Sequence, residues 1–148
     1  EQREMLAGCR KLTDRLYPGL DLTHEIQAVN RHGFGDTLLL WGERGLRGFA
    51  VCHCGEGTEA GAANCYIKFG AVCPGDGRGF DALVSACEEF ARQCGLPRLE
   101  AGVSLARGPA YRLLRERGFR VYRLGVNMHR PDEPAYHQHE AYVIDDWR

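Results

Sequence analysis

A glycine-rich segment, residues 75–79, separates a strand pattern from the strongest helix pattern of the chain. The first amide groups of a helix are unpaired and lie at the positive end of its dipole, so a helix entered through such a loop can bind a phosphate. Glycines allow close backbone approach and positive φ, and an arginine can pair with phosphate oxygens. We therefore predict a pyrophosphate site formed by Gly75, Gly77, Arg78 and Gly79. A merely flexible turn is the alternative that the same glycines allow.

The run Cys52-His53-Cys54 carries side chains that bind metal ions. On a strand, Cys52 and Cys54 would share one face while His53 points to the other, so the histidine could not easily join the two thiolates. Two ligands are too few, and further ones would have to come from Cys65 or Cys73. A second possible cluster consists of three histidines near the C-terminus: His129, His137 and His139. Because histidines in a proline-bearing loop are usually solvated, we predict no metal site.

Hydrophobic periodicity orders the elements that must position these residues. Apolar spacing of three and four predicts helices over residues 5–16, 22–29, 80–94 and 109–117. Short apolar or alternating runs predict strands over residues 37–41, 46–54, 65–72, 99–103 and 142–147, and a further strand that opens at Phe119 and extends to Arg130 at most. In the third strand, Cys65, Ile67, Phe69 and Ala71 alternate with their neighbours, which predicts a shared face. The first three strands then form an antiparallel meander.

Composition limits the classes of function. The 148 residues fit one domain, residues 1–148, that can bury a core without disulfides. The 19 basic and 20 acidic residues give a formal charge of -1, which favours a small neutral or mixed-charge partner over nucleic acid or an anionic membrane. No apolar run is long enough to span a membrane, and the opening residues are too charged for a signal peptide. The odd number of cysteines, seven, predicts free thiols and a cytoplasmic location.

The order of elements resembles that of the GNAT superfamily of N-acetyltransferases over nearly the whole chain. Two segments carry the likeness most specifically: Phe69-Gly70-Ala71-Val72-Cys73-Pro74 before the main helix, and Arg117-Gly118-Phe119 after the next one. The resemblance implies an α/β fold of the acyl-CoA N-acyltransferase type, with a mixed, mostly antiparallel sheet flanked by helices and its first strand missing. A chain that lacks this strand is expected to be a fragment or the C-terminal half of a tandem protein.

The resemblance also implies a co-substrate and a reaction. Acetyl-CoA would place its phosphates at the glycine-rich loop and its pantetheine arm along the backbone of Ala71, Val72 and Cys73. The acetyl group would pass to a primary amine of a small molecule or peptide. The chain departs from the family's loop pattern, because Asp81 and Leu83 stand where the family has glycine or alanine. Asp81 is a candidate to cap the helix.

Two residues are candidates for proton transfer. Family members often use a tyrosine as general acid at the position where this chain has Leu114, so Tyr111, one turn earlier, is the candidate replacement. Glu100 is a candidate base, with solvent exposure as its structural alternative. If neither acts, the resemblance implies an inactive domain that binds acyl-CoA, senses it or dimerises. Such a domain would pair with a second copy of itself, as a homodimer, or with a tandem partner domain.

Overall fold

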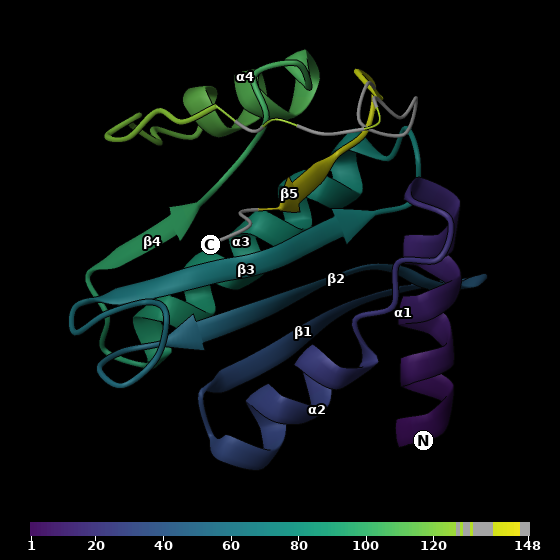
Figure 1. Ribbon diagram of the computed structural model, residues 1–148, viewed down its shortest axis with the longest axis horizontal. Coiled ribbons are helices and arrows are strands. Elements are labelled where there is room, and N and C mark those ends of the chain that lie inside the picture. Colours follow the sequence, from purple (N-terminus) through teal and green to yellow (C-terminus); the bar gives the residue numbers. More distant parts are fainter. Residues whose placement is uncertain (127, 129–130, 132–137, 146–148) are drawn as a thin grey trace.

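The computed structural model describes residues 1–126, 128, 131 and 138–145. The described elements follow the chain in this order: α1 (Gln2–Leu16), α2 (Thr23–His32), β1 (Gly35–Gly42), β2 (Gly45–Cys54), β3 (Asn64–Val72), α3 (Gly77–Gln93), β4 (Arg98–Ala101), α4 (Gly108–Glu116) and β5 (Val143–Asp145). A central sheet has α1 and α2 on one side and α3 on the other (Figure 1). This confirms the predicted mixed α/β fold with helices flanking the sheet.

Two different strands share one edge of β3. The order along the sheet is β1-β2-β3-β4, and the first three strands form the predicted antiparallel meander. β4 runs parallel to the first half of β3, and their last paired residues are Ile67 and Ala101. β5 then pairs antiparallel with the second half of β3, where Ala71 lies opposite Val143. The C-terminal strand therefore lies in the space that opens where β3 and β4 part.

A β-bulge at Lys68 separates the two halves of β3. The paired positions of β2 and β3 skip Lys68, so this residue has no cross-strand partner on β2. An extra residue bends the strand and moves the following side chains to the opposite face. Cys65 and Ile67 therefore pack beside α3, whereas Phe69 and Ala71 pack beside α1 and α2. The prediction that these four residues share a face was wrong for this reason.

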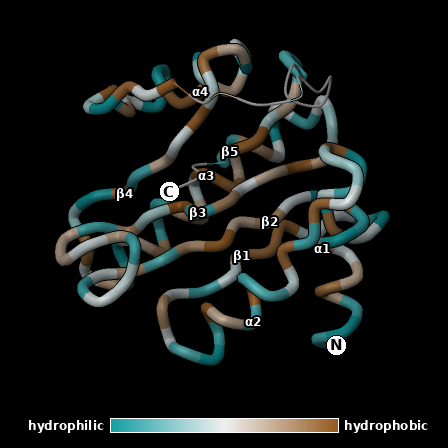
Figure 2. The backbone as a smooth tube through the Cα atoms, viewed as in Figure 1, coloured by the Kyte–Doolittle hydropathy of each residue, from teal (hydrophilic) through white to brown (hydrophobic). Residues whose placement is uncertain are grey.

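Each side of the sheet has its own hydrophobic core. Residues of α3, α4 and one sheet face form the first core, which includes Phe80, Val84 and Leu114. Residues of α1, α2 and the other face form the second, which includes Leu12 and Val29. Figure 2 shows apolar stretches concentrated along the central strands. Because β2 and β3 are buried on both faces, they belong to both cores.

Several element boundaries differ from the prediction. α3 begins at Gly77, inside the glycine-rich segment, and not at residue 80. The prediction of a strand from Phe119 was wrong for its described part, since residues 119–126 form none. Apolar side chains are frequent there, but the backbone pairs with no neighbouring strand in the described residues, and an unpaired segment is not a strand. α2 continues past residue 29 to His32, and its C-cap Gly33 is left-handed with φ 66°.

Parts of two predicted segments lie outside the described residues. They are positions 127, 129 and 130 of the strand expected after Phe119, and positions 146 and 147 of the last strand. Among the described residues, no helix combines the length and apolar character that crossing a membrane would take.

Candidate functional site

Asp76 organises the loop that leads into α3. It is the N-cap of the helix, and its Oδ1 accepts a hydrogen bond of 2.8 Å from the backbone N–H of Gly79. Arg47 of β2 donates to both carboxylate oxygens of Asp76, with Nη2 at 2.9 and 2.8 Å. The arginine neutralises the carboxylate, so the helix start is less repulsive to a phosphate than a lone aspartate would make it. The prediction that Asp81 caps the helix was wrong, because Asp76 takes that place.

Two of the loop glycines make room for side chains of this same protein. A Cβ atom on Gly79 would collide with Oδ2 of Asp76, and one on Gly77 would lie 2.9 Å from the hydroxyl oxygen of Tyr142. Gly75 adopts φ +78°, a conformation that suits glycine. Packing explains glycine at positions 77 and 79, and backbone conformation explains it at position 75, so none of the three requires a ligand.

Most of the first amides of α3 already donate within the chain. The N–H of Gly77 bonds the carbonyl of Gly75 at 3.1 Å, and that of Phe80 bonds the carbonyl of Asp76 at 2.9 Å. The ring of Tyr142 packs on Phe80, with centroids 5.3 Å apart. Arg78 is exposed on the first turn. An anion at the start of α3 would therefore contact the Arg78 side chain more readily than free backbone amides.

The end of β3 is also engaged by neighbouring strands. The N–H of Val72 donates to the carbonyl of Tyr142 at 3.4 Å, and the N–H of Cys73 donates to the carbonyl of Arg47 at 2.7 Å. Ala71 lies opposite Val143. The residues predicted to line the pantetheine arm are thus brought together with the glycine-rich loop, but protein backbone occupies the strand edge beside them.

A buried ion pair holds β5 in this position. Arg107, the N-cap of α4, is 5 % exposed, and its Nη1 and Nη2 lie 2.5 and 2.9 Å from the two carboxylate oxygens of Asp145. Arg107 also donates to the hydroxyl of Tyr17, whose own contact with Asp145 Oδ2 spans 3.4 Å. Residues from three distant parts of the chain therefore meet at β5: the end of α1, the start of α4 and β5 itself.

The electrostatics of this cluster keep it in one charge state at neutral pH. Burial, followed by the negative charge of Asp145, raises the pKa of Tyr17 to about 12. Burial opposes the charge on Arg107, yet its bonds to Asp145 outweigh that effect, so the pKa of the guanidinium is raised. At neutral pH, Tyr17 is therefore neutral and Arg107 is positively charged. Sequence reasoning missed this cluster, because no local motif connects its three members.

The two candidates for proton transfer lie on separate elements. Glu100 lies on β4, and its Oε2 accepts a hydrogen bond of 3.0 Å from the hydroxyl of Tyr122. Tyr111 lies on the first turns of α4 and is partly buried. Asp81 is used elsewhere, in an ion pair of 2.6 Å with Arg117 near the end of α4. None of these contacts positions a proton donor on the glycine-rich loop.

The metal candidates are arranged as the strand geometry predicted. Cys52 and Cys54 both pack beside α3, whereas Nε2 of His53 lies on the other face, 2.9 Å from Glu25 of α2. His139 Nδ1 contacts the carbonyl of Ala106 at 2.8 Å, and His129 and His137 lie outside the described residues. In the described part of the chain, no three histidine, cysteine or acidic residues are placed to hold an ion.

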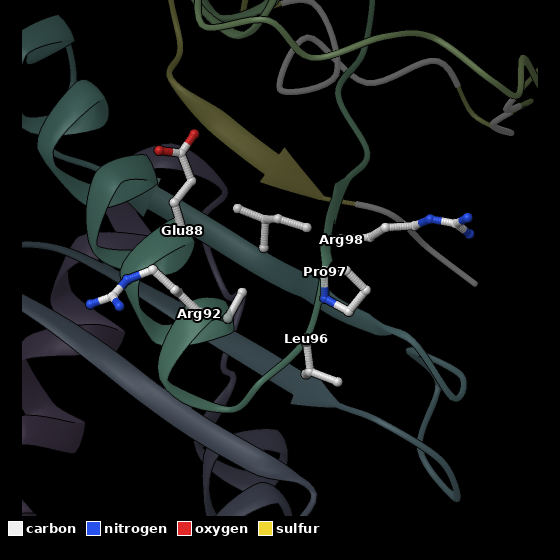
Figure 3. Close-up of a pocket in the computed structure, with 7 residues that line it drawn as sticks. Glu88, Arg92, Leu96, Pro97 and Arg98 are labelled. Carbon is white, nitrogen blue, oxygen red and sulfur yellow. The ribbon is translucent and has the colours of Figure 1, made fainter.

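A separate hollow of about 340 Å³ lies at the other end of α3. Its lining comes from the last turns of α3 and the start of β4: Glu88, Ala91, Arg92, Leu96, Pro97, Arg98 and Leu99. Figure 3 shows that the charged ends of Arg92 and Arg98 point away from each other. Arg92 pairs with Glu89 and Glu88 pairs with Arg117, so little charge converges on the hollow. It does not resemble a phosphate site.

Comparison with known proteins gives structural neighbours alone. No family model and no curated protein matches the chain. An acetyltransferase of Trypanosoma brucei, Tb11.01.2886, has a TM-score of 0.66 and 21% identity, covering 87% of this chain and 94% of its own. The aminoglycoside acetyltransferase AAC(6')-Iy, solved with a CoA bisubstrate analogue, has a TM-score of 0.62 and 15% identity. This match covers 86% of this chain and 92% of AAC(6')-Iy. The protein TTHA1254 of Thermus thermophilus has a TM-score of 0.64 and 15% identity. This match covers 88% of this chain and 93% of TTHA1254. The chain therefore has the GNAT-like acetyltransferase fold that its sequence resembles.

Proposed function

We propose that this chain binds acetyl-CoA at the start of α3 and transfers the acetyl group to a primary amine. The observation that carries the proposal is the acetyltransferase fold, in which β3 parts from β4 and then enters α3 through a glycine-rich loop. Arg78 and the positive end of α3 would hold the phosphates, and the thioester that acetyl-CoA supplies would be the acyl donor. Since AAC(6')-Iy is an aminoglycoside acetyltransferase, a small-molecule amine is the acceptor that we propose first.

The residues of this chain would have to do the remaining work. The amine must be neutral to attack, so a base or a water chain has to take its proton. Glu100 on β4 and Tyr111 on α4 remain the proposed base and acid. The edge of β3 along residues 71–73 would receive the pantetheine arm only after β5 gives way, because β5 pairs with the same strand.

A second candidate function rests on that last observation. β5 pairs with β3, Asp76 accepts the Gly79 amide, and Tyr142 lies next to Gly77. Groups of this chain therefore already occupy the strand edge and the loop that a cofactor would contact. A domain of this kind could keep the scaffold without turnover and act as an acyl-CoA-binding, sensing or dimerisation module, either as a homodimer or beside a tandem partner domain.

Binding and turnover separate the two candidates. Calorimetric titration with acetyl-CoA is expected to show binding that weakens in Arg78→Ala but not in Arg3→Ala, a matched removal of an exposed arginine on α1. Catalytic amounts of protein with an aminoglycoside, a polyamine, an amino acid and a peptide are then assayed for acetylated amine by mass spectrometry. Acetylation supports the transferase. Binding without product supports an acyl-CoA-binding or sensing module. Absence of binding in the intact protein contradicts both the transferase and this binding module, and leaves only the dimerisation module.

A further inference from the structure

Five of the seven cysteines form a connected thiol cluster between the sheet and α3: Cys52, Cys54, Cys65, Cys87 and Cys94. The Sγ atoms of Cys54 and Cys65 lie 3.8 Å apart, and those of Cys52 and Cys87 lie 3.9 Å apart. Cys52 also bonds Cys65, which joins the two pairs. All of these cysteines are free thiols. The proposed acetyl transfer uses none of them.

Exposure changes stepwise along one arm of the cluster. Cys94, the C-cap of α3, is exposed, Cys54 at the end of β2 is partly buried, and Cys65 on β3 is 0 % exposed. Cys94 is close enough to Cys54 to contribute to raising the pKa of that thiol by charge repulsion and hydrogen bonding, although burial and Cys65 contribute more. The three thiols therefore connect solvent with the interior of the sheet.

Cys65 ionises more readily than its neighbour Cys54. The Cys52 thiol donates a hydrogen bond to it and lowers its pKa, burial opposes this, and a second bond from Cys54 lowers the pKa further. Burial and the charge of Cys65 raise the pKa of Cys54. A thiolate is the attacking species in disulfide exchange, so Cys65 is suited to attack a disulfide that already includes its neighbour.

We propose that Cys54 and Cys65 close to a disulfide when hydrogen peroxide oxidises the exposed Cys94. The Cys94 thiolate attacks one peroxide oxygen, the O–O bond breaks, and hydroxide leaves with a proton as water. The sulfur of Cys54 attacks the resulting sulfenic acid, its proton leaves with the OH group as a second water, and a Cys54–Cys94 disulfide forms. The Cys65 thiolate then attacks Cys54, and Cys94 leaves as a thiolate. One peroxide and two thiols give one disulfide and two waters.

Strand geometry favours this pair as the end product. Cys54 and Cys65 are directly opposite each other on β2 and β3. The next pair toward the loop is hydrogen-bonded, from the N–H of Gly55 to the carbonyl of Asn64 at 3.0 Å, so the two cysteines occupy a closely spaced antiparallel position. Opposite Cβ atoms in such pairs are about 5 Å apart, near the separation that a disulfide spans. Cys52 and Cys87 are buried, at 0 % and 1 % exposure, which keeps peroxide from both.

Tryptic mapping distinguishes the products. Cleavage at arginine and lysine puts Cys52, Cys54 and Cys65 on one peptide, residues 48–68, while Cys87 lies on residues 79–92 and Cys94 on residues 93–98. After one equivalent of peroxide, alkylation and digestion without reductant, we expect peptide 48–68 to lack two hydrogens and to carry one alkyl group, on Cys52. At early times, a cross-link between peptides 48–68 and 93–98 is expected to appear and then decay.

Two variants test the route. Cys94→Ser is expected to slow disulfide formation by about tenfold or more, because buried thiols react slowly with peroxide. Cys54→Ser should prevent the internal disulfide and leave oxidised Cys94. Cys73→Ser is the matched control, since Cys73 is also a partly buried thiol but lies outside the cluster, and its rate should equal that of the unchanged protein. A main product that joins peptides 48–68 and 79–92, sulfinic acid on Cys94 without a disulfide, or an unchanged rate in Cys94→Ser would each overturn the proposal.

Discussion

Asp76 and Gly79 act as a unit at the start of α3. The Asp76 carboxylate accepts the Gly79 amide and two donors of Arg47, and it occupies the space that a Cβ atom on residue 79 would need. A side chain at residue 79 thus displaces the cap and its ion pair together. The identity of this one residue is set by a contact three positions earlier in the chain.

We predict that Gly79→Ala lowers the free energy of unfolding by about 1 to 2 kcal/mol, the usual effect of losing an N-cap. The better intrinsic helix propensity of alanine would offset part of this loss. Chemical denaturation followed by circular dichroism measures the change. Arg78→Ala, at the neighbouring exposed position, is the control and should change stability by less than about 0.5 kcal/mol. A Gly79→Ala protein as stable as the original would contradict the role assigned to Asp76.

At the scale of elements, β5 depends on side chains more than on its own length. It has three residues, Val143–Asp145, and its pairing with β3 is short. Arg107 and Asp145, at 6 % and 7 % side-chain exposure, anchor it to the start of α4. A buried pair of this kind costs desolvation when it forms, but removal of one partner leaves the other charge unpaired.

We predict that Asp145→Asn lowers the free energy of unfolding by about 3 kcal/mol or more, since Arg107 remains buried without its counter-charge. Hydrogen exchange should also accelerate at the Val72 amide, which donates to Tyr142 next to β5. The control Asp81→Asn breaks an ion pair with Arg117 in which the aspartate is exposed. It should lower the free energy of unfolding by less than about 1 kcal/mol. Equal losses in the two variants would show that the buried pair does not anchor β5.

The variant Asp145→Asn also tests the proposed cofactor site. If β5 must leave β3 before acetyl-CoA binds, the free energy spent on displacing it is smaller in Asp145→Asn. The apparent Kd of acetyl-CoA should then fall in this variant and stay unchanged in Asp81→Asn. A higher Kd in Asp145→Asn would mean that β5 supports the site and does not compete with the ligand.

At the scale of the whole molecule, local patterns predicted the elements and long-range contacts decided their arrangement. The spacing of Leu83, Val84 and Cys87 was sufficient to predict α3, because a helix stripe is a local signal. The bulge at Lys68 was not predictable, since it depends on how β2 and β3 pair across the sheet. For the candidate site, the sequence located the glycine-rich loop but could not show that β5 lies beside it.

The two cores are expected to unfold together, because β2 and β3 contribute side chains to both. Val29 of α2 and Val84 of α3 are buried at 1 % and 0 % exposure, one in each core. Val29→Ala and Val84→Ala should each lower the free energy of unfolding by about 1 to 3 kcal/mol, whereas Val121→Ala at an exposed position should have little effect. Denaturation of each variant should give one transition that coincides by near- and far-ultraviolet circular dichroism. A second transition in either core variant would mean that one layer of helices can leave the sheet alone, because β2 and β3 would then keep their structure while one of their faces is exposed.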